Sequence, residues 1–355
     1  MKLRIQIFCL LCGFCLKPMD GMGAPWVDDL GLTRLFARLP QAPLSQGVAV
    51  PVRKILRFEQ DNALFLGDRG AQTLSNVLAR FERIPFNAID FGASHITEVG
   101  LKSIESILEK HPEITCLNLR DNGITGEKIS WNISTPLHRL RELHLGFNKI
   151  SDQGMKKLFR AQLDSALQYL DLQGNSFTYI GIFSLADFLK TNKTLTFLNL
   201  SKNRFGNLGA FGVAECLKSN HSLQTLEMRS CKIRDEGAKT LGKFLGMNKG
   251  LEDLDLSDNA IGDEGAMGLA AAFATNHTLK KLDLDGNHIQ DAGACALAKA
   301  FLESNSPLEE LRIQWNCLGP KGLACLAKLK EKRTKLIVMD TLQKPTECLG
   351  QGTSG

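Results

Sequence analysis

Aromatic side chains are scarce in this sequence, which has 2 Tyr and 3 Trp among 355 residues. A surface that stacks single-stranded bases usually carries more of them, so the sequence disfavours such a ligand. Acidic and basic residues are intermixed and nearly balanced, at 38 and 43, which provides no basic tract for nucleic acid. No run of about 18 apolar residues occurs, so we expect no membrane span.

Motifs for catalysis are also missing. The sequence contains no Gly-Lys-Ser/Thr phosphate loop, no His-Glu-x-x-His and no Gly-x-Ser-x-Gly. The histidines are dispersed, and His221 and His277 occupy equivalent positions two residues before a strand leucine. We therefore expect no enzyme activity, no cofactor, no metal site and no small-molecule substrate.

The ten cysteines form no obvious framework. Cys9, Cys12 and Cys15 have a spacing typical of an iron–sulfur run, but Met19 stands where the bacterial pattern needs its fourth cysteine. The other seven are scattered, and an odd number cannot all pair within one chain. They are interpreted as free, partly buried thiols, as in a protein of a reducing compartment.

Residues 1–24 have the layout of a secretory signal peptide. Lys2 and Arg4 precede an apolar run over residues 5–16, and the small residues Gly21, Gly23 and Ala24 follow. The alternative is an apolar N-terminal helix that covers the first repeat. Export conflicts with free thiols, and secretion into a reducing host cell would reconcile the two. A cytoplasmic location is the alternative.

One pattern fills most of the chain, and its clearest copy is Leu251-x-x-Leu254-x-Leu256-x-x-Asn259-x-Ile261. Nine copies, spaced by 26 to 29 residues, start at Phe86, Ile114, Leu140, Leu167, Leu195, Leu223, Leu251, Leu279 and Leu308. A tenth strand is expected at residues 336–339, and an incomplete first unit begins near Pro51. This gives a repeat array over residues 51–340, preceded by a linker or cap at 25–50 and followed by a flexible tail at 341–355.

Each half of the unit predicts a different element. Around Leu254 and Leu256 apolar residues alternate with polar ones, which is the two-residue period of a β-strand. The leucines are therefore expected to point inward. The amide of Asn259 can satisfy backbone groups in the bend that follows. The second half has apolar residues at helix spacing, with Asp and Glu in its first turn, as at Asp263 and Glu264.

These residues resemble the leucine-rich repeat family, and the 28-residue unit is similar to its ribonuclease-inhibitor subtype. The Asp-Glu-Gly-Ala string looks most like the repeats of NOD-like receptors. The resemblance implies an α/β leucine-rich repeat solenoid. Because helices need about 8–10 Å and strands about 4.8 Å, the array should curve into a horseshoe with a concave sheet and convex helices. Pro136 interrupts the helix pattern, so we expect an irregular convex segment at residues 131–136.

Four glycosylation sequons begin at Asn132, Asn192, Asn220 and Asn276. The last three share one repeat position, just before the strand, and Asn248 holds the same place without a sequon. This recurrence favours a structural role for the asparagines where the chain leaves each helix, with glycosylation as the alternative.

The concave face carries the candidate protein-binding residues, which lie between the strand leucines. The aromatic candidates are Phe147, Tyr169 and Phe197, with His144 beside them, and the ninth repeat adds Arg312 and Trp315. The acidic candidates are Glu227, Asp253, Asp255, Asp258, Asp283 and Asp285. Exposed aromatics on a rigid sheet are typical binding anchors, and acids favour a basic partner and disfavour nucleic acid.

We therefore expect a non-enzymatic scaffold that binds a protein partner on this face, and that acts as a secreted effector. The family suggests two alternatives, a small-GTPase regulator like the Ran GTPase-activating protein and a ubiquitin-ligase adaptor. The first is weakly supported, because residues 341–355 contain Glu347 as their one acid.

Overall fold

The computed structural model describes residues 4–9, 54–59, 67–127, 139–160 and 166–340. It forms two compact units. Unit 1 comprises Met1–Ile150 and Arg160–Asp171, and unit 2 comprises Ser151–Phe159 and Leu172–Gly355. The expected linker at 25–50, the irregular segment at 131–136 and the tail at 341–355 lie outside the described residues. No described helix is long and apolar enough to traverse a bilayer.

Unit 1 is built on short parallel strands. Its elements are β1 (Arg4–Cys9), β2 (Lys54–Glu59), α2 (Gly67–Leu78), β3 (Ala88–Asp90), α3 (Glu98–Lys110), β4 (Cys116–Asn118), β5 (Glu142–His144) and β6 (Tyr169–Asp171). Strands β2 to β6 pair in parallel in chain order, whereas β1 pairs antiparallel with β2. Part of the expected export segment is therefore a strand, and the rest of residues 1–24 lies outside the described ranges.

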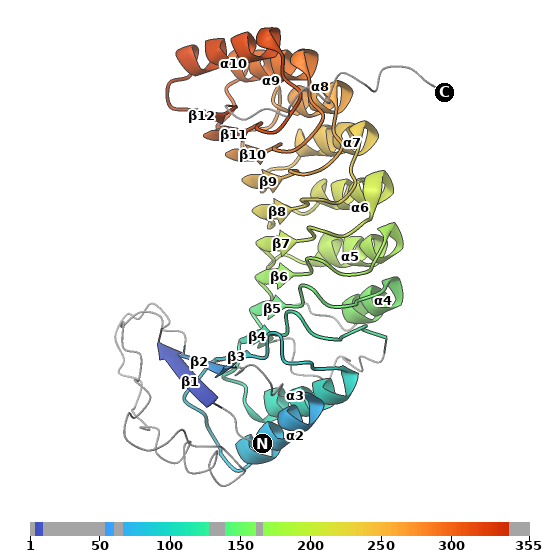
Figure 1. Cartoon of the computed structure of the whole chain (residues 1–355), viewed down its shortest axis with the longest axis vertical. Helices are drawn as coiled ribbons and strands as arrows, with labels where there is room; N and C mark the ends of the chain where they lie inside the picture. The colour runs from blue at the N-terminus through green and yellow to red at the C-terminus, as the bar shows by residue number, and fades with distance from the viewer. Residues whose placement is uncertain (1–3, 10–53, 60–66, 128–138, 161–165, 341–355) are drawn as a thin grey trace. The chain divides into compact units, whose positions relative to one another are not determined.

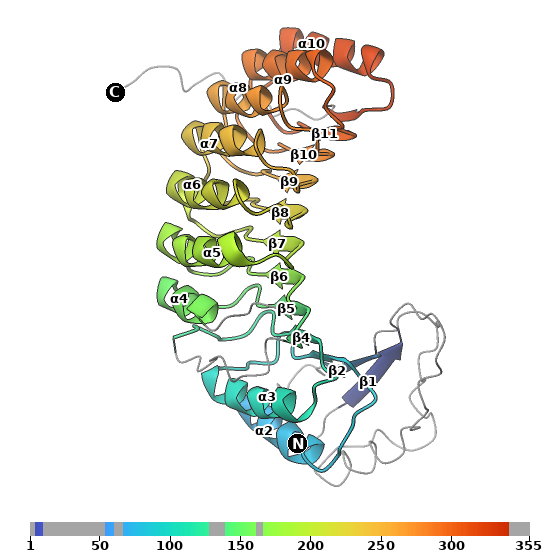
Figure 2. The same ribbon diagram turned by 180° about the vertical axis from the view of Figure 1, so that it is seen from behind.

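Unit 2 repeats one strand and one helix. Its elements are α4 (Asp152–Arg160, with Arg160 assigned to unit 1), α5 (Tyr179–Thr191), β7 (Phe197–Asn199), α6 (Gly206–Leu217), β8 (Thr225–Glu227), α7 (Asp235–Leu245), β9 (Asp253–Asp255), α8 (Asp263–Ala272), β10 (Lys281–Asp283), α9 (Asp291–Glu303), β11 (Glu310–Arg312), α10 (Pro320–Lys332) and β12 (Ile337–Met339). Strands β7 to β12 form a parallel ladder, and α6 to α10 form a second layer behind it (Figures 1 and 2).

The expected α/β solenoid is therefore confirmed, including the strand near residue 336 and the incomplete first unit. The central residue is buried in β3 to β11, and in each of these strands at least one flanking residue is partly exposed. In β9, Leu254 is 1% exposed, while Asp253 and Asp255 are intermediate. The core lies between strands and helices and is filled mainly by leucine.

The asparagine that ends each strand ties one repeat to the next. The Nδ2 of Asn259 donates to the carbonyls of Leu256 at 2.9 Å and Met228 at 2.9 Å, and its Oδ1 accepts from the N–H of Ile233 at 3.0 Å. Asn122, Asn148, Asn203, Asn287 and Asn316 make equivalent bonds. Cys231 fills the same place, and its thiol donates to the carbonyl of Leu200. The predicted role of the asparagine is confirmed.

The residue just before each of these positions has a left-handed backbone. The φ values lie between 50° and 72° at Ala93, Asp121, Phe147, Gly174, Lys202, Ser230, Asp258, Gly286 and Trp315. Glycine and asparagine suit this region, whereas a large side chain there is strained by about 1–2 kcal/mol. Phe147 and Trp315 are thus held in a conformation that their own chemistry disfavours.

The Asp-x-Gly string caps helices across the repeat boundary. The Oδ1 of Asp235, in the first turn of α7, accepts from the N–H groups of Gly262 at 2.7 Å and Gly265 at 2.9 Å, at the start of α8. Asp68, Asp152, Asp263 and Asp291 do the same for the helix that follows each of them. The acid was expected to favour its own helix, but its main hydrogen bonds go to the next one.

A second asparagine ladder runs along the helix exits. The Nδ2 of Asn220 donates to the carbonyls of Leu189 and Asn192, and the Nδ2 of Asn248 donates to those of Leu217 and Asn220. Asn192, Asn220 and Asn276 are at most 2% exposed, so these sequons cannot carry a glycan in the folded chain. Asn132 lies outside the described residues.

The expectation that the seven scattered cysteines are all free is wrong. Cys295 of α9 and Cys325 of α10 form a disulfide, with their Cα atoms 5.2 Å apart, and Cys317 is also disulfide-bonded. A separation of 30 residues is close to one repeat, so stacking brings the first two thiols together. Among the described cysteines Cys116, Cys216 and Cys231 are free.

Gly265→Ala should destabilise unit 2 by about 1–3 kcal/mol. A Cβ atom there would lie 2.7 Å from the Asp235 Oδ1 and 2.7 Å from the Ile261 Cγ2. The resulting shift would break the cap, and this loss should exceed the roughly 1 kcal/mol that alanine gains over glycine in a helix. Urea denaturation followed by circular dichroism measures the change.

Gly123→Ala is the control, because the nearest atom to a Cβ there is 3.7 Å away. Its unfolding midpoint should stay close to that of the wild type. A Gly265→Ala variant as stable as the wild type would contradict the cross-repeat cap.

Candidate partner-binding faces

The outward positions of the unit 1 strands form two rows. Cys116, Glu142 and Tyr169 are register partners on β4, β5 and β6, and Asn118, His144 and Asp171 form the second row. Neighbouring strands lie about 4.8 Å apart, so side chains on successive repeats are in reach of each other.

The aromatic candidates fall in both units. The rings of His144 and Tyr169 lie 4.7 Å apart, and the guanidinium of Arg120 lies 4.4 Å from the ring centre of Phe147. The same guanidinium pairs with Asp171, whose Oδ2 lies 2.9 Å from its Nη1. Phe197 is half-buried on β7, in unit 2. A single cluster that includes Phe197 stays a prediction.

Cys116, Glu142 and His144 converge on the face of unit 1. The Cys116 Sγ lies 3.7 Å from the Glu142 Oε2, which lies 3.8 Å from the His144 Nε2. All three ligand atoms lie within 4.8 Å of one another, the one such group among the residues described. Cys116 and Glu142 were not among the predicted site residues. They occupy equivalent positions in adjacent repeats, and this equivalence predicts that their side chains are neighbours on the sheet.

A row of carboxylates crosses the face of unit 2. Glu227, Asp255 and Asp283 are successive register partners on β8, β9 and β10, and Arg312 on β11 ends the row. All four side chains are partly exposed. Three of the six predicted acidic residues are thus aligned, at the spacing of adjacent strands.

Four of the predicted acids also make contacts within the fold. Asp255 accepts from the Ser257 N–H at 2.7 Å, and Asp283 accepts from the Asp285 N–H at 2.9 Å. Asp285 is 9% exposed, accepts from the Gln314 N–H at 2.6 Å and pairs with Arg312 at 2.8 Å. Asp258 pairs with Arg229 at 2.6 Å. Two basic residues on this face were not among the predicted site residues. They are Arg229 and Lys281, and Lys281 lies beside Asp253 in the ladder.

Burial raises the pKa of Asp283 to about 7, and the neighbouring carboxylates of Asp285 and Asp255 act in the same direction. The Arg312 Nε lies 2.9 Å from this carboxylate and opposes the rise. Burial likewise raises the pKa of Asp253. The charged form of Asp283 is therefore disfavoured in the folded chain at neutral pH.

Trp315 is the most exposed aromatic residue described in unit 2, where Tyr179, Phe183 and Phe211 on α5 and α6 are also exposed. Its side chain is 47% exposed, and it occupies one of the left-handed positions described above. It lies three residues after Arg312, at the turn that follows β11.

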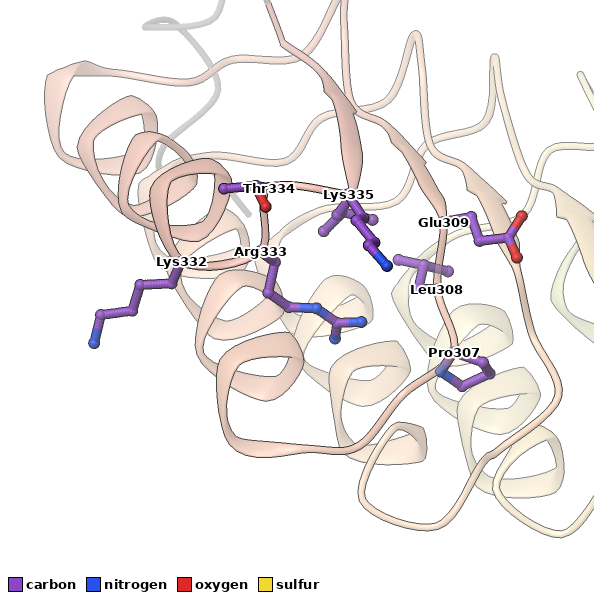
Figure 3. Close-up of a pocket in the computed structure, with 8 residues that line it drawn as sticks. Pro307, Leu308, Glu309, Lys332, Arg333, Thr334 and Lys335 are labelled. Carbon is purple, nitrogen blue, oxygen red and sulfur yellow. The ribbon is translucent and has the colours of Figure 1, made fainter.

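A depression near the end of the array is lined by residues 307–309 and 332–336 (Figure 3). Arg333 donates hydrogen bonds to the carbonyls of Phe301 at 2.9 Å and Ser306 at 2.7 Å. Its guanidinium therefore already binds the backbone of the preceding repeat. The lining contains no nucleophile paired with a base, and we assign it a structural role.

The sequence profile of the leucine-rich repeat family matches seven segments, namely residues 111–127, 138–159, 191–214, 219–242, 248–270, 275–298 and 304–327. The chain is a leucine-rich repeat protein. Proteins of this family are generally interaction scaffolds without enzymatic activity. The outward face of the leucine-rich repeats is therefore where a protein partner is to be sought.

Other comparisons add little. A solved structure described as Leiomodin-1 Actin-Binding Site 2 (ABS2) is similar over 42% of this chain and 87% of that chain, with 19% identity and a TM-score of 0.37. So low a TM-score supports no functional argument. No curated protein matches the sequence.

Asp283→Asn should stabilise the leucine-rich repeats relative to the wild type, and this gain should be larger at pH 8 than at pH 5. The pKa of Asp283 is about 7 in the folded chain and about 4 when unfolded, so the folded state holds an extra proton between these values. Stability from this group therefore falls as pH rises from about 4 to about 7. Asparagine removes that dependence, and thermal melts at both pH values measure it.

Asp187→Asn, at an exposed position on α5, provides the control and should show no such difference. A loss of stability at pH 8 in Asp283→Asn would mean that the ion pair with Arg312 outweighs burial.

Proposed function

We propose that the chain is a protein-binding scaffold and that the strand face of unit 2 recognises a basic segment of its partner. The observation that carries the proposal is the row of Glu227, Asp255 and Asp283 on adjacent strands. Like charges on facing positions of a sheet destabilise it. A basic partner would neutralise them.

The fold alone does not require a charge at these positions. Asp255 and Asp283 each accept from the backbone N–H two residues later, but Asn118 and Asn199 make the same bond without a charge. The raised pKa of Asp283 means that its charged form is disfavoured within the chain, and Arg312 already serves Asp285 as well. Carboxylates held in an unfavourable position often belong to functional sites. Lysine or arginine side chains of a partner would stabilise the charged forms and speed association.

Trp315 would supply an apolar anchor beside this row. Its ring is largely exposed, and its backbone is one that glycine would adopt more easily. Exposed aromatics contribute strongly to interfaces, whereas the surrounding contacts contribute little. Tyr169 and Phe197 are the corresponding candidates on β6 and β7. No particular observation favours the GTPase regulator or the ubiquitin-ligase adaptor.

The charged row and the anchor should affect different rate constants. Glu227→Gln with Asp255→Asn should lower the association rate of a partner captured from its source cells, and should flatten the salt dependence of that rate. Trp315→Gly should raise the dissociation rate by about tenfold or more without changing the salt dependence. Surface plasmon resonance at several salt concentrations separates the two effects.

Glu215→Gln with Glu236→Gln is the matched control, because it removes two exposed acids from α6 and α7. This pair should leave both rates unchanged. Glycine suits the φ of +57° at position 315, so Trp315→Gly should keep its thermal stability. Unchanged binding in every strand-face variant would contradict the proposal.

We also propose that the chain is exported to an oxidising compartment. The disulfide between Cys295 and Cys325 supports this, because such bonds persist mainly outside the reducing cytosol. Cys216 and Cys231 are fully buried, so their free thiols are compatible with an oxidising medium. Cys116 is partly exposed, so among the described cysteines one free thiol still favours a reducing destination.

Leu10→Arg with Leu11→Arg should retain the protein inside cells that otherwise secrete it, because charge disrupts the apolar part of a signal. Leu10→Val with Leu11→Val keeps the run apolar and should be secreted normally. Immunoblotting of cells and medium makes the comparison. Equal secretion of both variants would show that residues 1–24 are not an address.

A further inference from the structure

The face of unit 1 holds three different metal-ligand atoms on two adjacent strands. They are the Sγ of Cys116 on β4 and the Oε2 of Glu142 and Nε2 of His144 on β5. Cys116 and Glu142 are direct register partners, and His144 lies two residues beyond Glu142, so it projects from the same side of the sheet.

The distances are close to those of a tetrahedral metal site. Zinc binds cysteine sulfur at about 2.3 Å and histidine nitrogen or carboxylate oxygen at about 2.0–2.2 Å, which places tetrahedral ligand pairs roughly 3.4–3.6 Å apart. The observed separations are 3.7 Å between sulfur and oxygen and 3.8 Å between oxygen and nitrogen. The remaining pair lies within 4.8 Å.

The donor set selects the metal. A thiolate and an imidazole disfavour the oxygen-seeking ions calcium and magnesium, whereas zinc accepts sulfur, nitrogen and oxygen together. Three protein ligands leave a fourth position of a tetrahedron open. The side chains of Glu142 and His144 are 20% and 25% exposed, so the ligands are accessible without being fully solvated.

The surrounding side chains restrict the imidazole. The ring of Tyr169 packs 4.7 Å from that of His144, which limits the rotation of the ligand. Fixed ligand orientation commonly strengthens metal binding by 10- to 100-fold. Cys116 is a free cysteine, so its sulfur is available as a ligand.

We propose that Cys116, Glu142 and His144 form a zinc-binding site on the strand face of unit 1, with one coordination position open to the solvent. The site lies outside the acidic row of unit 2 and does not depend on it.

Cobalt(II) and zinc titrations of the full-length protein test the proposal. Cobalt should produce a near-ultraviolet thiolate charge-transfer band and the visible bands of a tetrahedral ion, both displaced by zinc. Cys116→Ser should remove the charge-transfer band and lower the zinc stoichiometry by one per chain. His144→Gln and Glu142→Gln should each weaken zinc binding by at least about tenfold.

The control concerns the other cysteines. Changing Cys9, Cys12 and Cys15 together to Ser should leave the charge-transfer band intact. It should also leave the one zinc ion per chain whose binding depends on Cys116. A band that survives Cys116→Ser but disappears in the triple variant would overturn the proposal, as would the absence of zinc binding. Circular dichroism should be unchanged in Cys116→Ser, because the residue is only partly buried. If that variant fails to fold, His144→Gln provides the same spectral test through loss of the tetrahedral bands.

Discussion

The hydrogen bonds of one asparagine per repeat determine the arrangement of the strand face. The amide of Asn259 bonds to its own turn and to backbone groups of the preceding repeat, and its neighbours along the ladder do the same. A buried amide that lost these partners would leave several backbone groups unsatisfied. The ladder therefore fixes the register of adjacent strands, and it forces the preceding residue into a left-handed turn. The exposed position of Trp315 is a direct consequence of that turn.

The two remaining ladders divide structural residues from available ones. Aspartates such as Asp235 cap the next helix, and asparagines such as Asn248 connect the helix exits. These polar groups face other repeats, so they cannot also recognise a partner. A partner can be recognised by side chains outside these ladders. On the strand face, such side chains are found among the residues that flank each buried leucine. Glu227 and His144 are such residues in units 2 and 1, respectively.

Features that recur with the repeat could be predicted from the sequence, whereas contacts between particular repeats could not. The buried leucines, the bends at Asn259 and its equivalents, and the role of Asn220 follow from a pattern seen many times. The disulfide between Cys295 and Cys325 and the meeting of Cys116 with Glu142 each occur once, so they can be found only by aligning equivalent positions of two neighbouring repeats. Asp285 was expected to be available, but it is buried because it accepts the Gln314 N–H and pairs with Arg312. These pairs become visible only when the register between neighbouring repeats is known.

A rigid ladder brings side chains together at a fixed spacing whether or not their chemistry favours it. At about 4.8 Å, two carboxylates repel each other, whereas a thiol, a carboxylate and an imidazole are almost close enough to share a metal ion. The row of Glu227, Asp255 and Asp283 and the cluster of Cys116, Glu142 and His144 are opposite results of this one constraint. Neither arrangement contributes to the core, and burial disfavours the charged form of Asp283 at neutral pH. Their presence is therefore better explained by an external ligand than by stability: a basic protein segment for the row and a metal ion for the cluster.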